Sequence, residues 1–533
     1  MAERYENLSR EELIRLLVAR DRREATRFGL VWEANEIERD KALNADFVAF
    51  DLLPELSVGG PPWRNLIIEG DNFDALRCLR LAFTGRVKCI LIDPPYNTGQ
   101  KDFVYNDRFV DVNDLWRHSK WVEFMYQRLT LARDLLAPDG AIFVCIDDNE
   151  FHTLGLLMSK VFGEGNFVGN FIWQHSVQPK GYSGNVSLHH NFIVAYAGSP
   201  LFRLKDMPRE EHHNVHYSNP DNDPSGPWRA GDVRNALYRP NLIYDLTTPS
   251  GKIIKPPAKG WRWSKGTMAE KIRTGEIVFR DDETRIVRKI YLSGQSGRPV
   301  ESIWFGEDVG TTREANQELK AIFDGEPPFS TPKPTRLVER MLGVTTGPDD
   351  TVLDFFAGSG TTGHAVLKQN AADGGRRRFI LVSNTEATAE QPDKNLCRDV
   401  CAPRVRKVIV GSGETAGLGG DFAYLRTCRV ERGRLTELSH EQVWTILQLI
   451  HGETVAPFKP GRWQWAGDAE QALLYVPQFR KEDAAALRKQ MRQSAAVILY
   501  SWQSELIRQH VRADHVQFEH LPESFSRRFG LKG

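Results

Sequence analysis

The chain has 533 residues, which is long enough for several domains and a substantial core. Lys and Arg together number 70, as do Asp and Glu, so global charge excludes a strongly basic protein and any nucleic-acid surface must be a local patch. No apolar run approaches the roughly 20 residues needed to span a bilayer, which argues against a membrane protein. Six scattered cysteines and no secretory signal predict a reducing, cytoplasmic compartment.

The first residues predict a helical arm. Ser9 and Glu12 have the spacing of a capping box, and Leu13, Leu16 and Leu17 then fall on one helix face. This arm either packs on the core or contacts another subunit, and a single apolar stripe favours the first.

Residues 65–92 predict a strand–helix–strand unit. An apolar strand at 65–69 leads through a polar turn into a helix at 73–81, and a second apolar strand follows at 87–92. Asp71 then lies at the carboxyl end of the first strand. It either contacts a ligand or caps the helix, and the sequence favours neither.

Asp93, Pro94, Pro95 and Tyr96 directly follow the second strand, where open α/β sheets place their ligands. Two consecutive prolines fix two φ angles and remove two N–H donors, which leaves a stiff turn. The Asp93 carboxylate and the Pro94 carbonyl can accept both hydrogens of an exocyclic amine, which frees the nitrogen lone pair for attack on a methyl donor. Tyr96 can stack on the base, for about 1–3 kcal/mol. The alternative is an ordinary strand-ending turn.

Further elements are expected around this turn. Residues 101–111 have loop composition and can close over the site. A helix at 120–136 and strands at 141–146 and 191–197 are predicted. The acidic residues 147–150 suggest a metal site, but the favourable charge at a helix start explains them better, so no metal site is predicted.

A glycine turn is the second strong signal. An extended stretch at 329–334 enters a helix at 335–341, and a strand at 351–356 then precedes Gly358, Gly360 and Gly363. Glycines permit close backbone approach, and the following helix start favours negative charge. Glu386, just beyond the next strand at 378–383, can accept both ribose hydroxyls. A dinucleotide site also fits this pattern. An enzyme that transfers hydride, however, does not need a turn such as Asp93–Tyr96, whose carboxylate can bind an exocyclic amine.

Composition changes twice along the chain. Residues 202–328 mix Trp, Pro, Gly and basic residues, which suits phosphate and base contacts, although an irregular domain with Trp in its own core is the alternative. A glycine-rich linker at 410–420 precedes a tail with helices at 440–450 and 482–494 and short strands at 473–475 and 496–500. Cys397 and Cys401 lack a second Cys or His pair nearby and are interpreted as structural.

Together these motifs resemble the beta class of DNA adenine-N6 methyltransferases, and more closely the modification subunits of type III restriction–modification systems. The resemblance rests on residues 28–33, 68–72, 93–99, 103–107, 332–334, 354–363 and 383–386.

The resemblance implies an α/β fold with a mostly parallel, Rossmann-like seven-stranded sheet, an inserted target-recognition domain and a small C-terminal α/β domain. The expected division is a helical arm (1–60), a catalytic half (61–201), a target-recognition domain (202–328), a cofactor-binding half (329–410) and a C-terminal domain (421–533) that can contact a subunit or partner.

The resemblance also implies S-adenosylmethionine as cofactor. Asp93, Pro94, Pro95 and Tyr96 would grip a flipped adenine. The cofactor would be held by Asp71, Thr331, Lys333, Asp354, Phe356, Gly358, Ser359, Gly360, Thr361 and Glu386, with Glu386 displaced from the strand end by two residues relative to the usual family spacing.

The implied partners are double-stranded DNA, a second copy of the chain in a homodimer, and a nuclease–helicase restriction subunit. The chain has no G-x-x-x-x-G-K-[ST] phosphate loop, so ATP-driven steps would need that second polypeptide. Two alternatives stay open: cytosine-N4 methylation, against which Asp rather than Ser at position 93 argues, and a DNA-recognition subunit with little methylation of its own. Cytosine-C5 chemistry is disfavoured because no Pro-Cys dipeptide is present and Cys145 lies in an apolar strand.

Overall fold

A ten-stranded sheet forms the centre of the computed structural model, which describes residues 46–99, 104–105, 108–109, 117–179, 186–325, 329–387, 391–413, 415–431, 437–452 and 454–528. The predicted helix of the first 45 residues and most of loop 101–111 lie outside the described residues. In spatial order the strands are β1 (Asp46–Leu52), β19 (Ala423–Glu431), β2 (Leu66–Glu69), β16 (Arg378–Ser383), β15 (Thr351–Asp354), β3 (Val87–Ile92), β6 (Leu136–Ile146), β8 (His190–Ala197), β7 (Phe167–Gln174) and β14 (Ile303–Trp304).

The sheet is mostly parallel, as predicted. Among its described strands, only β1 and β8 run against the others. The seven neighbouring strands from β2 to β7 are the expected seven-stranded sheet, and β19 and β1 extend one edge while β14 extends the other. The apolar runs that form β3 and β16 are buried along nearly their whole length, as expected for strands covered on both faces.

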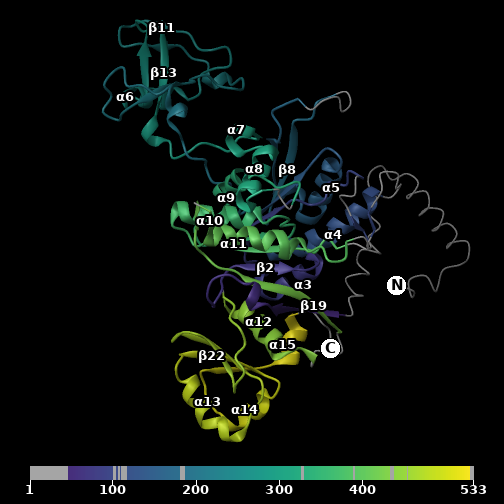
Figure 1. Cartoon of the computed structure of the whole chain (residues 1–533). Helices are drawn as coiled ribbons and strands as arrows, with labels where there is room; N and C mark the ends of the chain where they lie inside the picture. Colours follow the sequence, from purple (N-terminus) through teal and green to yellow (C-terminus); the bar gives the residue numbers. More distant parts are fainter. Residues whose placement is uncertain are drawn as a thin grey trace, which may run out of the picture.

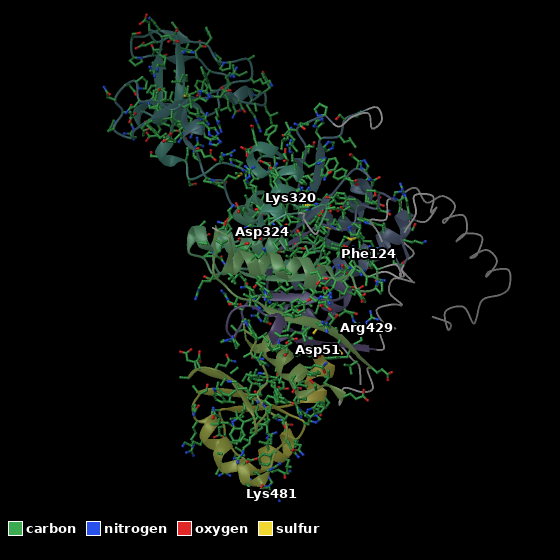
Figure 2. All side chains as sticks on the ribbon, viewed as in Figure 1. Asp51, Phe124, Lys320, Asp324, Arg429 and Lys481 are labelled. Carbon is green, nitrogen blue, oxygen red and sulfur yellow. The ribbon has the colours of Figure 1, made fainter. Side chains whose placement is uncertain are left out.

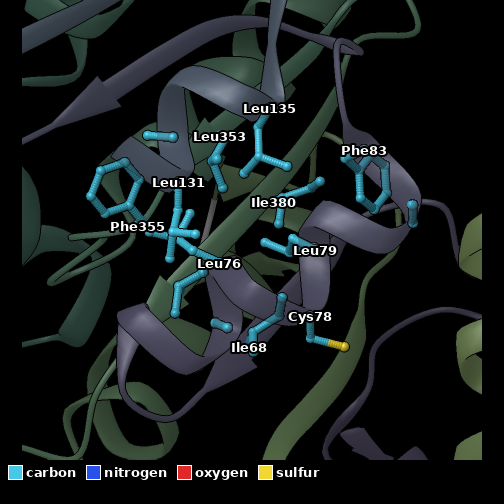
Figure 3. Close-up of a cluster of buried hydrophobic side chains, with 14 of the residues drawn as sticks. Ile68, Leu76, Cys78, Leu79, Phe83, Leu131, Leu135, Leu353, Phe355 and Ile380 are labelled. Atoms are coloured by element: carbon cyan, nitrogen blue, oxygen red, sulfur yellow. The ribbon is translucent and has the colours of Figure 1, made fainter. Parts of the chain in front are cut away.

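Helices cover both faces of the sheet (Figure 1). One face packs on α3 (Asn72–Phe83), α4 (Arg117–Leu135), α5 (Phe151–Phe162) and α12 (His440–His451), and the other on α9 (Thr335–Thr345), α10 (Thr361–Asp373) and α11 (Ala402–Val410). Figure 3 shows the first interface, in which Leu76 and Leu79 of α3 and Leu135 of α4 lie near Leu353 and Ile380 of the sheet. Each such buried leucine stabilises the fold by about 1.5–3 kcal/mol.

A separate lobe, which we call the insert lobe, occupies roughly residues 208–297 and stands away from the sheet (Figure 1). An antiparallel bridge between Met207 and Arg298 closes its base. Its three-stranded sheet, with β9 (Trp228–Gly231), β12 (Ile277–Arg280) and β13 (Arg285–Tyr291), carries α6 (Lys265–Arg273). Trp261 lies in its own small core, as the structural alternative for this region predicts.

The insert lobe ends earlier than the predicted boundary at 328. The chain returns to the central sheet at β14, where Trp304 is buried and stacks on Phe171 with ring centroids 4.7 Å apart. The next long helix, α8 (Thr312–Phe323), packs on α11, and just beyond it Asp324 pairs with Lys407 at 2.9 Å (Figure 2). Trp304 is therefore a core residue of the sheet and not part of a recognition surface.

Two other predicted boundaries also differ from the structure. Residues 46–52, assigned to the helical arm, form β1, and residues 423–431, assigned to the C-terminal domain, form β19 beside it. The following helix α12 covers this edge, where the Gln442 amide donates to the Asp51 carboxylate at 2.7 Å (Figure 2). The two strands are far apart in the chain, so no local pattern announces their pairing.

The remaining tail forms a smaller α/β unit with its own core around Leu474, Leu487 and Leu499. Its four strands are β20 (Gln464–Gly467), β21 (Gln471–Val476), β22 (Ala496–Ser501) and β23 (Val516–His520), with α13 (Ala484–Met491), α14 (Ser504–His510) and α15 (Leu521–Arg528). The strands and helices expected in this tail are therefore confirmed. None of the helices in the described part of the chain has both the length and the hydropathy to cross a bilayer.

Candidate active site

The two signal motifs leave the same edge of the sheet. Strands β3 and β15 are parallel neighbours, with Cys89 opposite Val352 and Ile90 opposite Leu353. The turn at 93–97, which we call the catalytic turn after its predicted role, follows β3, and the glycine turn follows β15. The carboxyl ends of parallel neighbours meet at one edge, so the topology brings together motifs that are some 260 residues apart.

Lys333 joins the two motifs directly. Its ammonium pairs with Oδ2 of Asp93, and its backbone carbonyl accepts a hydrogen bond of 3.3 Å from the Thr361 hydroxyl. The same ammonium lies 5.3 Å from the ring centroid of Tyr96, a distance at which a cation is attracted to the ring face. The resemblance places Lys333 near the cofactor carboxylate, whereas here its charged end lies at the catalytic turn.

The catalytic turn presents unsatisfied polar atoms. Trp121 donates a hydrogen bond of 2.7 Å from its indole nitrogen to the Pro95 carbonyl, which fixes the middle of the turn. Oδ1 of Asp93 and the hydroxyl of Tyr96 are both buried and have no hydrogen-bond partner among the described residues. Burial, together with the Asp93 charge, raises the pKa of Tyr96 well above its usual value, so the phenol stays neutral. A buried carboxylate oxygen that has no hydrogen bond within the protein is suited to accept a hydrogen bond from a ligand.

The glycine turn has the backbone conformations that only glycine adopts readily. Gly358 has φ +50° and Gly360 has φ +79°. A Cβ atom at Gly360 would lie 3.1 Å from both the carbonyl oxygen and the Sγ of Cys401, a tight approach that these neighbours could relieve only by shifting slightly. Helix α10 begins directly after the turn and directs its first N–H groups toward it.

Asp354 ends β15 and is almost fully buried. One carboxylate oxygen accepts from the Thr362 hydroxyl at 2.6 Å and the other from the Phe356 amide at 3.0 Å. Burial raises the pKa of this carboxyl to about 7, despite both hydrogen bonds. Asp354 therefore braces the glycine turn from inside.

Arg404 is a site residue that the sequence reasoning missed. Its side chain is fully buried under the glycine turn and donates to the hydroxyls of Ser359 at 3.0 Å and Thr361 at 2.7 Å. It also reaches Glu318 of α8 at 3.3 Å. No sequence signal identifies it, because an arginine in a helix is usually exposed and only the tertiary packing reveals this one.

Asp71 caps helix α3, accepting from the Phe73 amide at 2.7 Å, so the capping interpretation is confirmed. It also pairs with Arg128 at 3.1 Å. Arg128 in turn lies over the ring of Phe124, 3.6 Å from its centroid (Figure 2). The neighbouring Asn72 donates to the Phe355 carbonyl at 2.9 Å, which ties the Asp71 turn to the strand that leads into the glycine turn.

The other predicted cofactor residues are less enclosed. Glu386 adopts φ +51° beyond β16, and its carboxylate pairs with Lys394 at 2.8 Å. Thr331 is exposed on the extended segment before α9, and Phe356 is half-buried with its ring centroid 6.0 Å from that of Phe124. Their contacts with a cofactor stay predictions.

The acidic residues 147–150 do start a helix, because α5 begins at Phe151. Glu150, however, makes no capping hydrogen bond to that helix. Its side chain is fully buried and accepts from the amide of Asn97, the last residue of the catalytic turn. The helix-start interpretation therefore accounts for the position of this acid but not for the direction of its carboxylate.

The residues present fit S-adenosylmethionine in their chemistry. The glycine turn gives a close backbone approach next to a helix start, and Oδ1 of the neighbouring Asp93 makes no hydrogen bond within the described chain. The aromatic ring of Phe356 is half-buried at the same turn. This combination suits a cofactor that has a carboxylate, a ribose and an adenine, placed beside an amine-accepting group.

A family model described as DNA methylase matches residues 87–382, which include both motifs and more than half of the chain. The chain belongs to the DNA methylase family. The match begins at the first residue of β3 and ends one residue before the end of β16.

Individual relatives agree with this assignment. The StyLTI Mod subunit of a type III restriction-modification enzyme from Salmonella typhimurium is 34% identical over an alignment of 375 residues, and the match covers 64% of this chain and 57% of that protein. The type II methyltransferase M.KpnI from Klebsiella pneumoniae is 31% identical over an alignment of 380 residues, and the match covers 66% of this chain and 88% of the relative. The chain thus spans less than two thirds of the Salmonella subunit.

A solved structure of a DNA modification methylase from Thermus thermophilus, complexed with S-adenosyl-L-methionine, covers 68% of this chain and 99% of its own. It is 15% identical to this chain, with a TM-score of 0.31.

Proposed function

We propose that the chain is a site-specific DNA methyltransferase that transfers a methyl group from S-adenosylmethionine to N6 of adenine. The observation that carries this proposal is the unpartnered, buried Oδ1 of Asp93 beside a glycine turn on the adjacent parallel strand. A carboxylate oxygen in this position can accept a hydrogen bond from the exocyclic amine of a base.

The catalytic turn acts by positioning and by electrostatics. Asp93 Oδ1 and the Pro94 carbonyl each accept a hydrogen bond from N6. These two bonds turn the nitrogen lone pair out of conjugation with the ring. Lys333 holds the other Asp93 oxygen and thereby sets the direction of the carboxylate. The ring of Tyr96 stacks on the target base. The transfer would be direct: the N6–methyl bond would form as the sulfonium–methyl bond breaks, and one N6 proton would then pass to solvent. No enzyme nucleophile takes part, because burial raises the pKa of the Cys145 thiol to about 12 and removes it as a candidate.

The cofactor-binding residues are proposed from the family resemblance, and the glycine turn beside Asp93 supports the assignment. S-adenosylmethionine supplies an electrophilic methyl group on a sulfonium. Its methionine end is assigned to the turn from Asp354 to Thr361, which includes Phe356, Gly358, Ser359 and Gly360. Glu386 is assigned to the ribose, Asp71 to the adenine side and Thr331 to the neighbourhood of the carboxylate. The resemblance also places Lys333 there, but its ammonium pairs with Asp93, so we assign its charged end to the catalytic turn.

The DNA substrate is assigned to the insert lobe together with the catalytic edge. Lys and Arg outnumber Asp and Glu between residues 208 and 298, so the lobe is locally basic in a chain of zero net charge. Because an adenine inside a duplex cannot reach Asp93, the target base is flipped out of the stack. The chain serves as the modification subunit of a restriction–modification system, as a homodimer that pairs with a nuclease–helicase subunit.

A methyl-transfer assay with tritium-labelled S-adenosylmethionine on bacterial DNA, followed by nucleoside analysis, tests the function. Label in N6-methyladenine is expected. Label in N4-methylcytosine would show that the target base is cytosine and not adenine. Stable DNA binding without methyl transfer would show that the chain is a recognition subunit. The Asp93→Ala variant should lose transfer while its affinity for the cofactor stays within about threefold. Near-normal transfer by that variant would remove Asp93 from the mechanism.

A further inference from the structure

Glu150 has an environment that its place in the chain does not explain. It lies at the first residue before α5, yet its side chain makes no cap and is buried with 0% exposure. Oε1 accepts from the side-chain amide of Asn97 at 2.5 Å and from Nδ1 of His118 at 2.7 Å. Oε2 is also buried and has no partner in the described part of the chain. A buried carboxylate is costly, so its position calls for a role.

Asn97 is the residue through which Glu150 reaches the site. It directly follows Tyr96, is fully buried and adopts φ +58°, a left-handed conformation that non-glycine residues rarely take. Its amide donates to Glu150 and, at 3.3 Å, to the backbone carbonyl of Arg117. These two bonds hold the end of the Asp-Pro-Pro-Tyr turn, while Trp121 holds its middle through Pro95.

The sheet and one helix bring these groups together. Strands β3 and β6 are parallel neighbours with Ile92 opposite Val144, so Asn97 and Glu150 emerge at the same edge. His118 comes from the first turn of α4. Its Nε2 accepts from Arg117 at 3.2 Å, so the ring proton lies on Nδ1 and is donated to Glu150. The carboxylate therefore has two donors, and one of them belongs to the catalytic turn.

We propose that Glu150 is a positioning residue for methyl transfer: by holding Asn97 in its left-handed conformation, it fixes the directions of Tyr96 and Asp93. The proposal rests on the proposed function for the identity of the reaction, but not for the identity of the methylated base. A purely structural role at the start of α5 would use the carboxylate on the helix N–H groups, and Glu150 does not do so.

Exchange of donor and acceptor tests this role. Glu150→Ala removes the acceptor, and Asn97→Asp removes the donor and sets two buried carboxylates against each other. Each change should lower kcat by ten- to a hundredfold, because a misplacement of about 1 Å is enough for such losses. The cofactor Kd should stay within about threefold of the wild type.

The double variant Asn97→Asp/Glu150→Gln lets the glutamine amide donate to the new carboxylate. Its kcat should be at least tenfold higher than that of Asn97→Asp. Asp148→Asn, in the same acidic loop but half-exposed, is the control and should transfer at the wild-type rate.

Amide hydrogen exchange without DNA gives a readout that does not need activity. Amide exchange at residues 96–99 should be at least tenfold faster in Glu150→Ala than in the wild type, and slow again in the double variant. The exposed control Asp148→Asn should keep the wild-type melting temperature. Wild-type kcat in Glu150→Ala, wild-type exchange at the turn in that variant, or a double variant no better than Asn97→Asp would overturn the proposal. If the wild type methylates no adenine, the proposed function fails, and the exchange data still decide the role of Glu150.

Discussion

The ammonium of Lys333 pairs with the carboxylate of Asp93, although the two residues are 240 positions apart in the chain. The backbone carbonyl of the same lysine accepts from Thr361, the first residue of α10. One residue therefore connects the turn that receives the base to the turn assigned to the cofactor. The relationship explains how two motifs on separate strands can act as one site.

Replacement of Lys333 by glutamine should separate the two contacts of this residue. The variant keeps the backbone bond to Thr361 but loses the charge beside Asp93, so the carboxylate is free to turn away from the base. We expect kcat to fall at least tenfold while the cofactor Kd changes less than threefold, as measured by single-turnover transfer and equilibrium binding. A loss confined to cofactor affinity would contradict this role and favour a contact with the cofactor carboxylate.

Tyr96 should act through its ring and not through its hydroxyl. The hydroxyl has no hydrogen-bond partner within the described residues, so Tyr96→Phe should transfer within about threefold of the wild type. Tyr96→Ala should lower kcat/KM by roughly ten- to a hundredfold, because base–aromatic stacking contributes about 1–3 kcal/mol. Steady-state kinetics on one oligonucleotide duplex compares the pair. Equal losses in the two variants would show that the hydroxyl matters.

Asp354 should make stability depend on pH. Burial raises its pKa to about 7 from 3.8, so the folded chain holds this proton more tightly than the unfolded chain. Its contribution to the free energy of unfolding is complete below about pH 4 and is lost as the pH rises through 7. In Asp354→Asn the amide can donate to Thr362 and its oxygen can accept from Phe356, but no proton is lost.

Urea unfolding of the cofactor-free protein between pH 4 and 8 measures this difference. The free energy of unfolding of the wild type, relative to Asp354→Asn, should decline from pH 4 to 7 and then level off. Asp349→Asn changes an exposed acid before β15 and should keep the wild-type slope. Parallel curves for the wild type and Asp354→Asn would show that the carboxyl is ionised throughout.

Arg404→Met should weaken both the fold and the cofactor site. The variant removes the donors to Ser359 and Thr361 and leaves Glu318 without its buried partner, which should cost about 3 kcal/mol of stability. Cofactor Kd should rise at least tenfold, because the glycine turn loses its support. Arg406→Met, on the exposed side of the same helix, is the control. Adding Glu318→Gln should restore part of the stability; no recovery would mean that the ion pair is not the cause.

Local pattern predicted much of this molecule. The apolar runs of β3, β15 and β16, the stiff turn after β3 and the glycines after β15 all carry their structure in a few consecutive residues, so their placement at one sheet edge follows from parallel topology. The extended entry before α9 belongs to the same class, whereas the cap at Asp71 was one of two interpretations that the sequence left open. These features depend on backbone preference and burial pattern, which a sequence displays directly.

Features that depend on distant partners were not accessible in this way. Strands β1 and β19 pair with each other across most of the chain, and β14 returns to the sheet after the insert lobe, so the predicted domain boundaries were wrong at those points. Arg404 and Glu150 are charged residues that the sequence suggests are exposed, yet the fold buries both beside the site. Only the three-dimensional arrangement supplies the hydroxyls and amides that make such burial possible.

A crystal structure with S-adenosylhomocysteine or sinefungin tests the central claim most directly, because that claim is that the catalytic turn and the glycine turn form one site. The account predicts that the ligand lies against Gly358 and Gly360 with its reactive end facing Oδ1 of Asp93. A ligand bound elsewhere, or bound at the glycine turn with its reactive end directed away from Asp93, would contradict it.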